Sequence, residues 1–325
     1  MPSAYDKIAA FSLAMMAAAP AVAQSPSDGI PPPGAQAAGY TTLAFESDFT
    51  DPYFANRSNW LDCAGASSPQ WFMAGGNGQS PPPCSRVSIV HDGGVQVLDI
   101  KFTAADAPYL GTVLATVNSS LTRGIDFPNG AYWEITYRIL PAGRDNNPYG
   151  SLVTGFFIWS NSGQAGASRS FLENDFTETY ASGCCHAGTV VHVWGATPQG
   201  QHNFAVAGYG LPEYGVDETA YHTIAARVTQ DGTSNLALCM YVDGQFKNCE
   251  DMVSSGNSGA AGITSDQLNQ RNLLALQVGP LDSTPVDATI DMLVKDVKIW
   301  TCSNWKGTLN TPGNACNGAV LTSAP

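Results

Sequence analysis

The sequence has little positive charge. Only 14 of its 325 residues are lysine or arginine, against 27 aspartates and glutamates, and the formal net charge is −13. Such a chain cannot assemble the basic surface that releases counterions from a phosphate backbone. We therefore expect no nucleic-acid partner and no anionic membrane partner. A neutral ligand such as an uncharged sugar suits this charge balance best.

Long hydrophobic runs are also missing. The apolar stretch at residues 8–19 is too short to span a bilayer. Lys7 precedes it and Ala21-Val22-Ala23 follows it, which is the order of a secretory signal peptide. We interpret residues 1–23 as that signal and expect a secreted protein, extracellular or periplasmic. A buried N-terminal helix is the alternative.

No apolar stripe at helical spacing covers four turns, and residues 267–274 fit one short helix at most. Short runs of β-branched and aromatic residues, separated by Gly, Asn, Asp and Pro, begin at Tyr40 instead. Residues 133–139 alternate with period two, and Asp243-Gly244 is a hairpin turn signal. The expected strands are residues 41–47, 95–102, 111–117, 131–140, 151–159, 171–180, 189–195, 202–208, 220–229, 235–243, 271–279 and 288–300.

These strands around one core predict an all-β protein, a β-sandwich of two stacked antiparallel sheets. Residues 24–39 are rich in Pro, Gly and Ser, and we expect them to be extended. Residues 40–301 are expected to form one domain, followed by a tail at 302–325. We expect a monomer.

Cysteine occurs eight times but never as C-x-x-C, so a zinc site is disfavoured. In an exported chain, disulfides are expected instead. Many pairings are open, and local spacing favours Cys63–Cys84, Cys239–Cys249 and Cys302–Cys316. The adjacent Cys184-Cys185 would be a labile vicinal disulfide or two thiols.

Three acidic residues lie close together in one expected strand: Glu173, Asp175 and Glu178. Glu173 and Asp175 share a face of a strand, and Glu178 joins them only if a β-bulge at Phe176-Thr177 inserts an extra residue. Retaining glycoside hydrolysis needs a nucleophilic carboxylate and a carboxylic acid roughly 5–5.5 Å apart. Close like charges also raise one pKa, which keeps an acid protonated. The alternatives are a calcium site or a solvated strand face, although three like charges on one face repel each other.

The pattern Glu173-x-Asp175-x-x-Glu178 resembles the signature of glycoside hydrolase family 16, the laminarinase, lichenase and agarase group. Further blocks are similar to that family and follow its order, at residues 45–49, 129–141, 155–159, 221–223, 241–244 and 292–300. The resemblance implies a concanavalin A-like jelly roll and endo-acting, retaining hydrolysis of a β-linked polysaccharide. It also implies roles, with Glu173 as nucleophile, Asp175 as assisting carboxylate and Glu178 as general acid/base. Asn174 stands where the family usually has an aliphatic residue.

Aromatic side chains stack on the apolar faces of sugars, so a sugar-binding site is expected to carry them beside the acids. Trp159, Tyr180 and Trp194 lie on the expected acid strand or on its neighbours, and His192 could add a hydrogen bond. Core packing is the alternative for each aromatic residue, and an ordinary structural histidine is the alternative for His192.

No cofactor is required for this chemistry. Members of the family often hold a structural calcium ion between the first and last strands, and Glu46 and Asp296 are at the corresponding places. Backbone carbonyls would supply much of the calcium shell.

The leading hypothesis is a secreted endo-β-glycanase acting on a β-1,3-glucan or a mixed β-1,3/1,4-glucan. The alternative is a non-catalytic, lectin-like module on the same fold. A polysaccharide lyase is a third hypothesis, but it would favour acidic polymers and a basic cleft, which the net charge opposes.

Overall fold

A computed structural model describes most of the expected domain. The described residues are 30–75, 81–103, 111–120, 122–128, 131–142, 152–160, 171–180, 187–197, 200–205, 217–230, 236–251, 271–279 and 289–302. The predicted signal peptide, Cys184-Cys185 and most of the tail, with Cys316, lie outside these residues. In some strands only the backbone is described.

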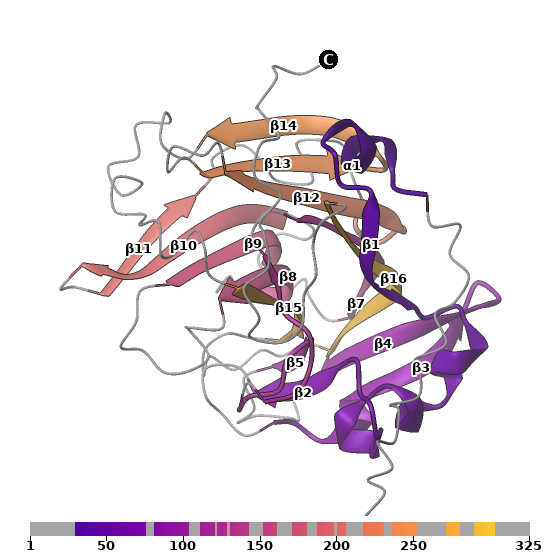
Figure 1. The fold of residues 1–325 in the computed structure, drawn as a ribbon. Helices are drawn as coiled ribbons and strands as arrows, with labels where there is room; N and C mark the ends of the chain where they lie inside the picture. The colour runs from indigo at the N-terminus through magenta and orange to yellow at the C-terminus, as the bar shows by residue number, and fades with distance from the viewer. Residues whose placement is uncertain are drawn as a thin grey trace, which may run out of the picture.

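The strands form two antiparallel sheets, which Figure 1 shows as two layers. Sheet 1 has the order β14-β13-β12-β7-β16-β4-β3, and β1 also pairs with β16. Its strands are β1 Thr42–Asp48, β3 Val87–Asp92, β4 Val95–Thr103, β7 Tyr132–Ala142, β12 His222–Gln230, β13 Leu236–Val242, β14 Gln245–Asp251 and β16 Thr289–Thr301.

Sheet 2 has the order β11-β10-β9-β8-β15-β5-β2, and β6 also pairs with β15. Its strands are β2 Phe72–Gly75, β5 Thr112–Ala115, β6 Phe127–Pro128, β8 Leu152–Ser160, β9 Phe171–Tyr180, β10 Ala187–Thr197, β11 Gly200–Ala205 and β15 Arg271–Val278. The acid strand β9 therefore lies inside the sheet, between β8 and β10.

Helical structure in the described chain is limited to single turns. They are α1 Pro33–Ala37 and the 3₁₀ turns η1 Pro52–Ala55, η2 Arg57–Asn59, η3 Asp62–Ala64 and η5 Cys84–Arg86. None of these is long and apolar enough to cross a bilayer.

The predicted all-β sandwich is confirmed, and every expected strand is present. The strands β2, β3 and β6 were not predicted, and β14 was anticipated only as the second arm of a hairpin. The short helix allowed at residues 267–274 is wrong where the structure describes it, because β15 begins at Arg271. Both faces of β15 are buried, with Leu273 and Leu274 at most 1% exposed. The sequence of a strand buried on both faces is a continuous apolar run. Hydrophobic periodicity cannot distinguish such a run from a buried helix.

Aromatic residues join the two sheets in the main core. The ring of Trp133 on β7 lies 6.2 Å from that of Phe176 on β9 and 5.3 Å from that of Phe127 on β6. Phe176 is 1% exposed and belongs to the same buried cluster as Leu274 and Leu276 of β15. These contacts define the inner face of sheet 2, which is turned towards sheet 1. The opposite face is called the outer face below.

The segment before β1 is folded rather than extended throughout. Pro33 begins α1, a position that suits the fixed φ angle of proline. Ala35 and Tyr40 are fully buried in a second cluster that contains Tyr132, Tyr241 and Trp300 of sheet 1. Gly34 packs directly on the ring of Tyr241, because a Cβ at Gly34 would lie 2.6 Å from a ring carbon. Residues 33–37 therefore depart from the extended segment predicted for 24–39 because they cover apolar surface of sheet 1 (Figure 1).

The predicted Cys63–Cys84 disulfide is present. Cys239 and Cys302 are also disulfide-bonded, and none of the described cysteines is free. The β13–β14 register sets Cys249 directly opposite Cys239, as the predicted hairpin pairing requires.

Candidate functional site

The acid strand β9 contains a bulge. Against β8, Thr177 pairs with Phe156 and Asp175 pairs with Phe157, which leaves Phe176 as an extra residue. The β10 side agrees, because the register is irregular over the same stretch of β9. The bulge predicted at Phe176-Thr177 is therefore present.

The bulge sets the three acidic residues on one face of the sheet. On β8, the residues opposite Glu173, Asp175 and Glu178 are Trp159, Phe157 and Gly155. These three partners are spaced two apart, and alternate residues of a strand share a face. Phe176 is buried on the inner face, so the register places the three acids on the outer face. Without the extra residue, Glu178 would fall on the inner face among apolar side chains.

Sheet 2 has almost no other formal charge. Its described strands contain no further Asp or Glu, and their one Lys or Arg is Arg271, at the beginning of β15. Glu173 is partly exposed, whereas Asp175 is 4% exposed. Burial and neighbouring negative charge both favour the protonated form of a carboxyl group. This arrangement can hold one protonated carboxylic acid close to an ionised carboxylate.

The predicted sugar-contacting residues lie at different distances from the acids. Trp159 on β8 and His192 on β10 are the direct register neighbours of Glu173. Trp194 lies further along β10, opposite Phe171, and Tyr180 ends β9. The structure thus brings Trp159 and His192 to Glu173, while Trp194 and Tyr180 lie towards the two ends of β9. The roles of all four residues stay predictions.

The row of residues through Glu178 was not anticipated. Glu178 has a glycine on each side, Gly188 on β10 and Gly155 on β8. On β15, the next residue in this row is Gln277. Glycine inside a strand weakens it and often marks a place where another group approaches the backbone closely. The sequence signal was Gly155 within an apolar strand, but its alignment with Glu178 depends on register.

The residues predicted for calcium surround a lysine. Lys298 lies between Glu46 on β1 and Glu134 on β7 in the register of sheet 1. Its Nζ is 3.9 Å from Glu46 Oε1 and 3.9 Å from Asp296 Oδ1. In the described part of the chain, no group of three or more His, Cys, Asp or Glu side chains could hold a metal ion. An ammonium group between the carboxylates does not fit a divalent cation at this place, and the calcium ion stays a prediction.

Glu134 is one of the buried acids of this cluster. Burial, with a smaller contribution from the nearby Asp296 carboxylate, raises the pKa of Glu134 to about 7. Burial likewise raises the pKa of Asp296, although Lys298 opposes this shift. The ion pair of Lys298 with Glu46 thus links β16 to β1.

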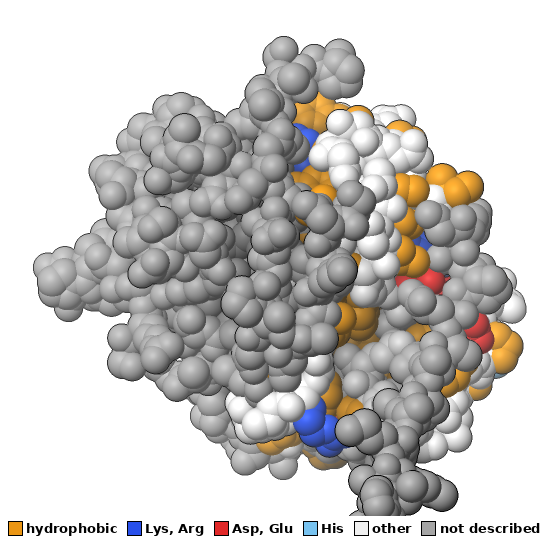
Figure 2. Space-filling view, viewed as in Figure 1, with side chains coloured by type: hydrophobic (Ala, Val, Ile, Leu, Met, Phe, Trp, Pro, Cys, Tyr) orange, Lys and Arg blue, Asp and Glu red, His pale blue; other side chains and the backbone are white. Residues whose placement is uncertain are grey.

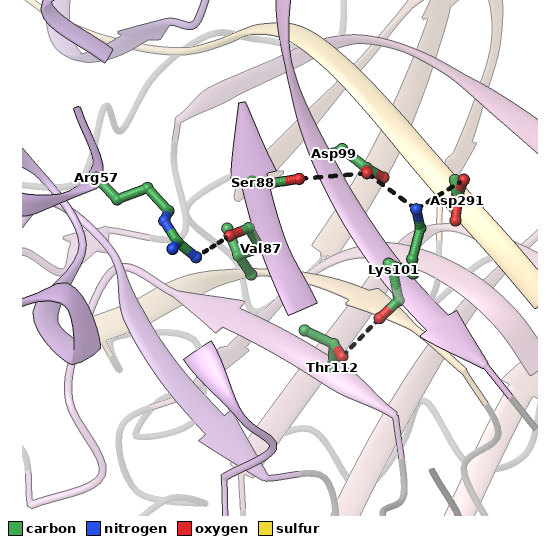
Figure 3. A network of polar contacts seen from close by, with 7 residues as sticks. All are labelled: Arg57, Val87, Ser88, Asp99, Lys101, Thr112 and Asp291. Carbon is green, nitrogen blue, oxygen red and sulfur yellow. Dashed lines mark hydrogen bonds and ion pairs between the residues drawn. The ribbon is translucent and has the colours of Figure 1, made fainter. Parts of the chain in front are cut away.

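A second network on sheet 1 repeats this pairing (Figure 3). The Nζ of Lys101 lies 3.4 Å from Asp99 Oδ2 on its own strand and 3.4 Å from Asp291 Oδ2 on β16. Ser88 donates a hydrogen bond to Asp99 from β3, at 3.4 Å. In the view of Figure 2, the described surface shows small, separate acidic and basic patches among neutral and hydrophobic side chains.

Comparison with known proteins finds structural rather than sequence similarity. No protein-family model and no curated protein sequence matches the chain. The catalytic domain of an endo-1,3-β-glucanase (laminarinase) from Thermotoga petrophila matches with a TM-score of 0.52 and 17% identity, over 81% of this chain and 98% of that one. The laminarinase catalytic domain from Thermotoga maritima gives 0.51 and 17%, over 80% and 97%.

An agarase has the same architecture. The structure of β-agarase A in complex with oligoagarose matches with a TM-score of 0.51 and 15% identity, over 80% of this chain and 92% of that one. Structural similarity at 15–17% sequence identity establishes a shared fold alone. The fold implied by the resemblance to family 16 is thus confirmed, and the chain has the β-sandwich fold of laminarinase and agarase structures.

Proposed function

We propose that the protein is a secreted, endo-acting, retaining β-glycanase. The observation that carries this proposal is the bulge in β9, which sets Glu173, Asp175 and Glu178 on the outer face of sheet 2. The shared fold with laminarinase and agarase structures supports it.

The proposed reaction has two displacements. In the first, Glu173 attacks the anomeric carbon while Glu178 gives its proton to the glycosidic oxygen, which leaves with the bonding electron pair. In the second, Glu178 takes a proton from water, and the resulting oxygen nucleophile displaces Glu173 from the sugar. Asp175, between the two glutamates in the strand, assists by hydrogen bonding and by raising the pKa of a neighbouring carboxyl group.

The proposed substrate is a neutral β-glucan with 1,3 or mixed 1,3/1,4 linkages. The strands of sheet 2 place three acids on β9 and only one cation, Arg271, so an anionic polymer would be repelled. Trp159 and His192, beside Glu173, would contact the sugar by stacking and by hydrogen bonding. Trp194 and Tyr180 would extend this contact along β9.

A substrate screen with a matched pair of variants tests the proposal. Reducing-sugar release is measured on laminarin, lichenan, agarose and carrageenan for the full chain and for Glu173→Gln. We expect hydrolysis of at least one β-glucan, and its loss in the variant with the fold intact. The Glu134→Gln variant carries the same chemical change in sheet 1, and we expect it to hydrolyse the glucan as the wild-type chain does. Glucan that binds but is never cleaved would indicate the lectin-like module, and full activity of Glu173→Gln would contradict the assigned nucleophile.

A further inference from the structure

Gln277 is a buried amide whose nitrogen has no hydrogen-bond partner. The residue is 2% exposed, and its Nε2 is enclosed without an acceptor. An unpaired buried donor lowers stability, and in a native protein it calls for an explanation. One known explanation is a role in a reaction, where the partner forms only as the reaction proceeds.

Strand alternation places Gln277 on the outer face of sheet 2. Its neighbours Leu276 and Val278 belong to the main core, so Gln277 has the opposite orientation. It shares this face with the apolar cluster of Leu273, Ala275, Val113, Ala115 and Val117. The amide therefore lies in surroundings of low polarity, where a hydrogen bond to a charged group is stronger than in water.

Gln277 and Glu178 belong to one row of the sheet. Gly155 is the register partner of both, towards Glu178 on β9 and towards Gln277 on β15. Two strand spacings separate their backbones, roughly 9.6 Å. Glutamate and glutamine each carry their polar group beyond two methylene groups, and Gly155 places no side chain between them. Gly155 is thus the one residue between Gln277 and Glu178 in this row.

We infer that Gln277 is a positioning residue for the acid/base carboxylate: its amide N–H stabilises the negative charge that Glu178 acquires when it protonates the leaving oxygen. The inference rests on the proposed function. The proton of Glu178 goes to the glycosidic oxygen and the electron pair of the broken bond stays on that oxygen, while Gln277 exchanges no proton. The proposed reaction begins with Glu178 protonated, so the full negative charge that the Gln277 donor would meet forms only as the proton leaves. A fixed donor aimed at developing charge needs no reorganisation during the reaction.

Asn174 provides a matched control. Both of its amide atoms are buried without a partner, and the residue is 0% exposed. It alternates with Phe176 on the inner face of β9, so it faces the core and not the row of Glu178. Gln277→Met removes a buried amide whose nitrogen is unpaired, and Asn174→Leu removes one whose nitrogen and oxygen are both unpaired, each with little change of volume. Both variants should keep or raise the melting temperature.

The pH profile of kcat/KM on a soluble β-glucan separates the two variants. In Gln277→Met, we expect kcat to fall about tenfold and the basic limb to move to higher pH by about one unit, because the ionised form of Glu178 loses its donor. In Asn174→Leu, we expect the basic limb to stay in place and kcat to change less than twofold.

Unchanged kcat and an unmoved basic limb in Gln277→Met would overturn the inference. So would a lower melting temperature with an unmoved basic limb, which is the result of a merely structural role. Should Gln277→Met fail to fold, Gln277→Glu serves in its place, because a second carboxyl group must move the basic limb upward, and an unmoved limb would overturn the inference. A wild-type chain that hydrolyses no glycan refutes the proposed function itself, and the inference with it.

Discussion

The two sheets differ in how acidic and basic side chains are distributed over their strands. In sheet 1, acidic side chains alternate with cations, as where Lys101 lies between Asp99 and Asp291 and where Lys298 lies between carboxylates. In sheet 2, every Asp and Glu of the described strands is on β9, and no Lys or Arg is found on β8, β9, β10 or β11.

The proposed function gives the acids of the two sheets different roles. A carboxylate paired with a lysine helps to join strands, and its removal is felt in stability. Three carboxylates on one face of a strand repel one another, and the proposed reaction uses acids held close together in this way. The comparison predicts that the same Glu→Gln change has different consequences in the two sheets.

The largest difference is expected in catalysis. Glu178→Gln should lower kcat on β-glucan by more than roughly a thousandfold, because it removes the proton donor for the leaving oxygen. Glu134→Gln should change kcat less than twofold. Steady-state kinetics gives kcat for both variants. An equal loss of kcat in the two would show that the acids of the two sheets do not differ in their effect on catalysis.

The next effect concerns the residue that creates the bulge. Phe176→Ala should lower the free energy of unfolding by about 3–5 kcal/mol, because Phe176 is buried between the sheets against Trp133. Urea denaturation measures it. A loss below about 1 kcal/mol would mean that Phe176 does not anchor the bulge to the core.

The third effect is a pH dependence of sheet 1. Folding raises the pKa of Glu134 to about 7, whereas the unfolded chain ionises it near 4.3. Between these values the folded state binds the extra proton, so the free energy of unfolding falls as pH rises from about 4.3 to 7. The loss is at most about 4 kcal/mol. Glu134→Gln should flatten this part of the pH curve, and an unchanged slope would contradict the assignment.

The smallest effect is expected from calcium. Lys298 already lies between Glu46 and Asp296, so EDTA or added calcium should leave the melting temperature unchanged within about 1 °C. Lys298→Met serves as the comparison, since it removes the ammonium group that lies between the two carboxylates. A clear loss of stability of the wild-type chain in EDTA would show that calcium binds despite Lys298.

Local patterns were sufficient for much of the fold and of the acid strand. Period-two alternation predicted β7, and the spacing of Glu173, Asp175 and Glu178 predicted the bulge because only an extra residue unites them. Which residues pair across strands could not be predicted from the sequence. The alignment of Glu178 with Gly155 and Gln277, for example, depends on the register of segments far apart in the chain. Lys298 was missed as a partner of Glu46 for the same reason.

The most direct test of the account is a crystal structure of the Glu173→Gln variant with a bound β-glucan oligosaccharide. We predict that the side chains of residues 173 and 178 both reach the outer face of sheet 2, with their terminal groups roughly 5–5.5 Å apart on either side of the anomeric centre. A Glu178 side chain buried on the inner face would contradict the proposed hydrolase mechanism.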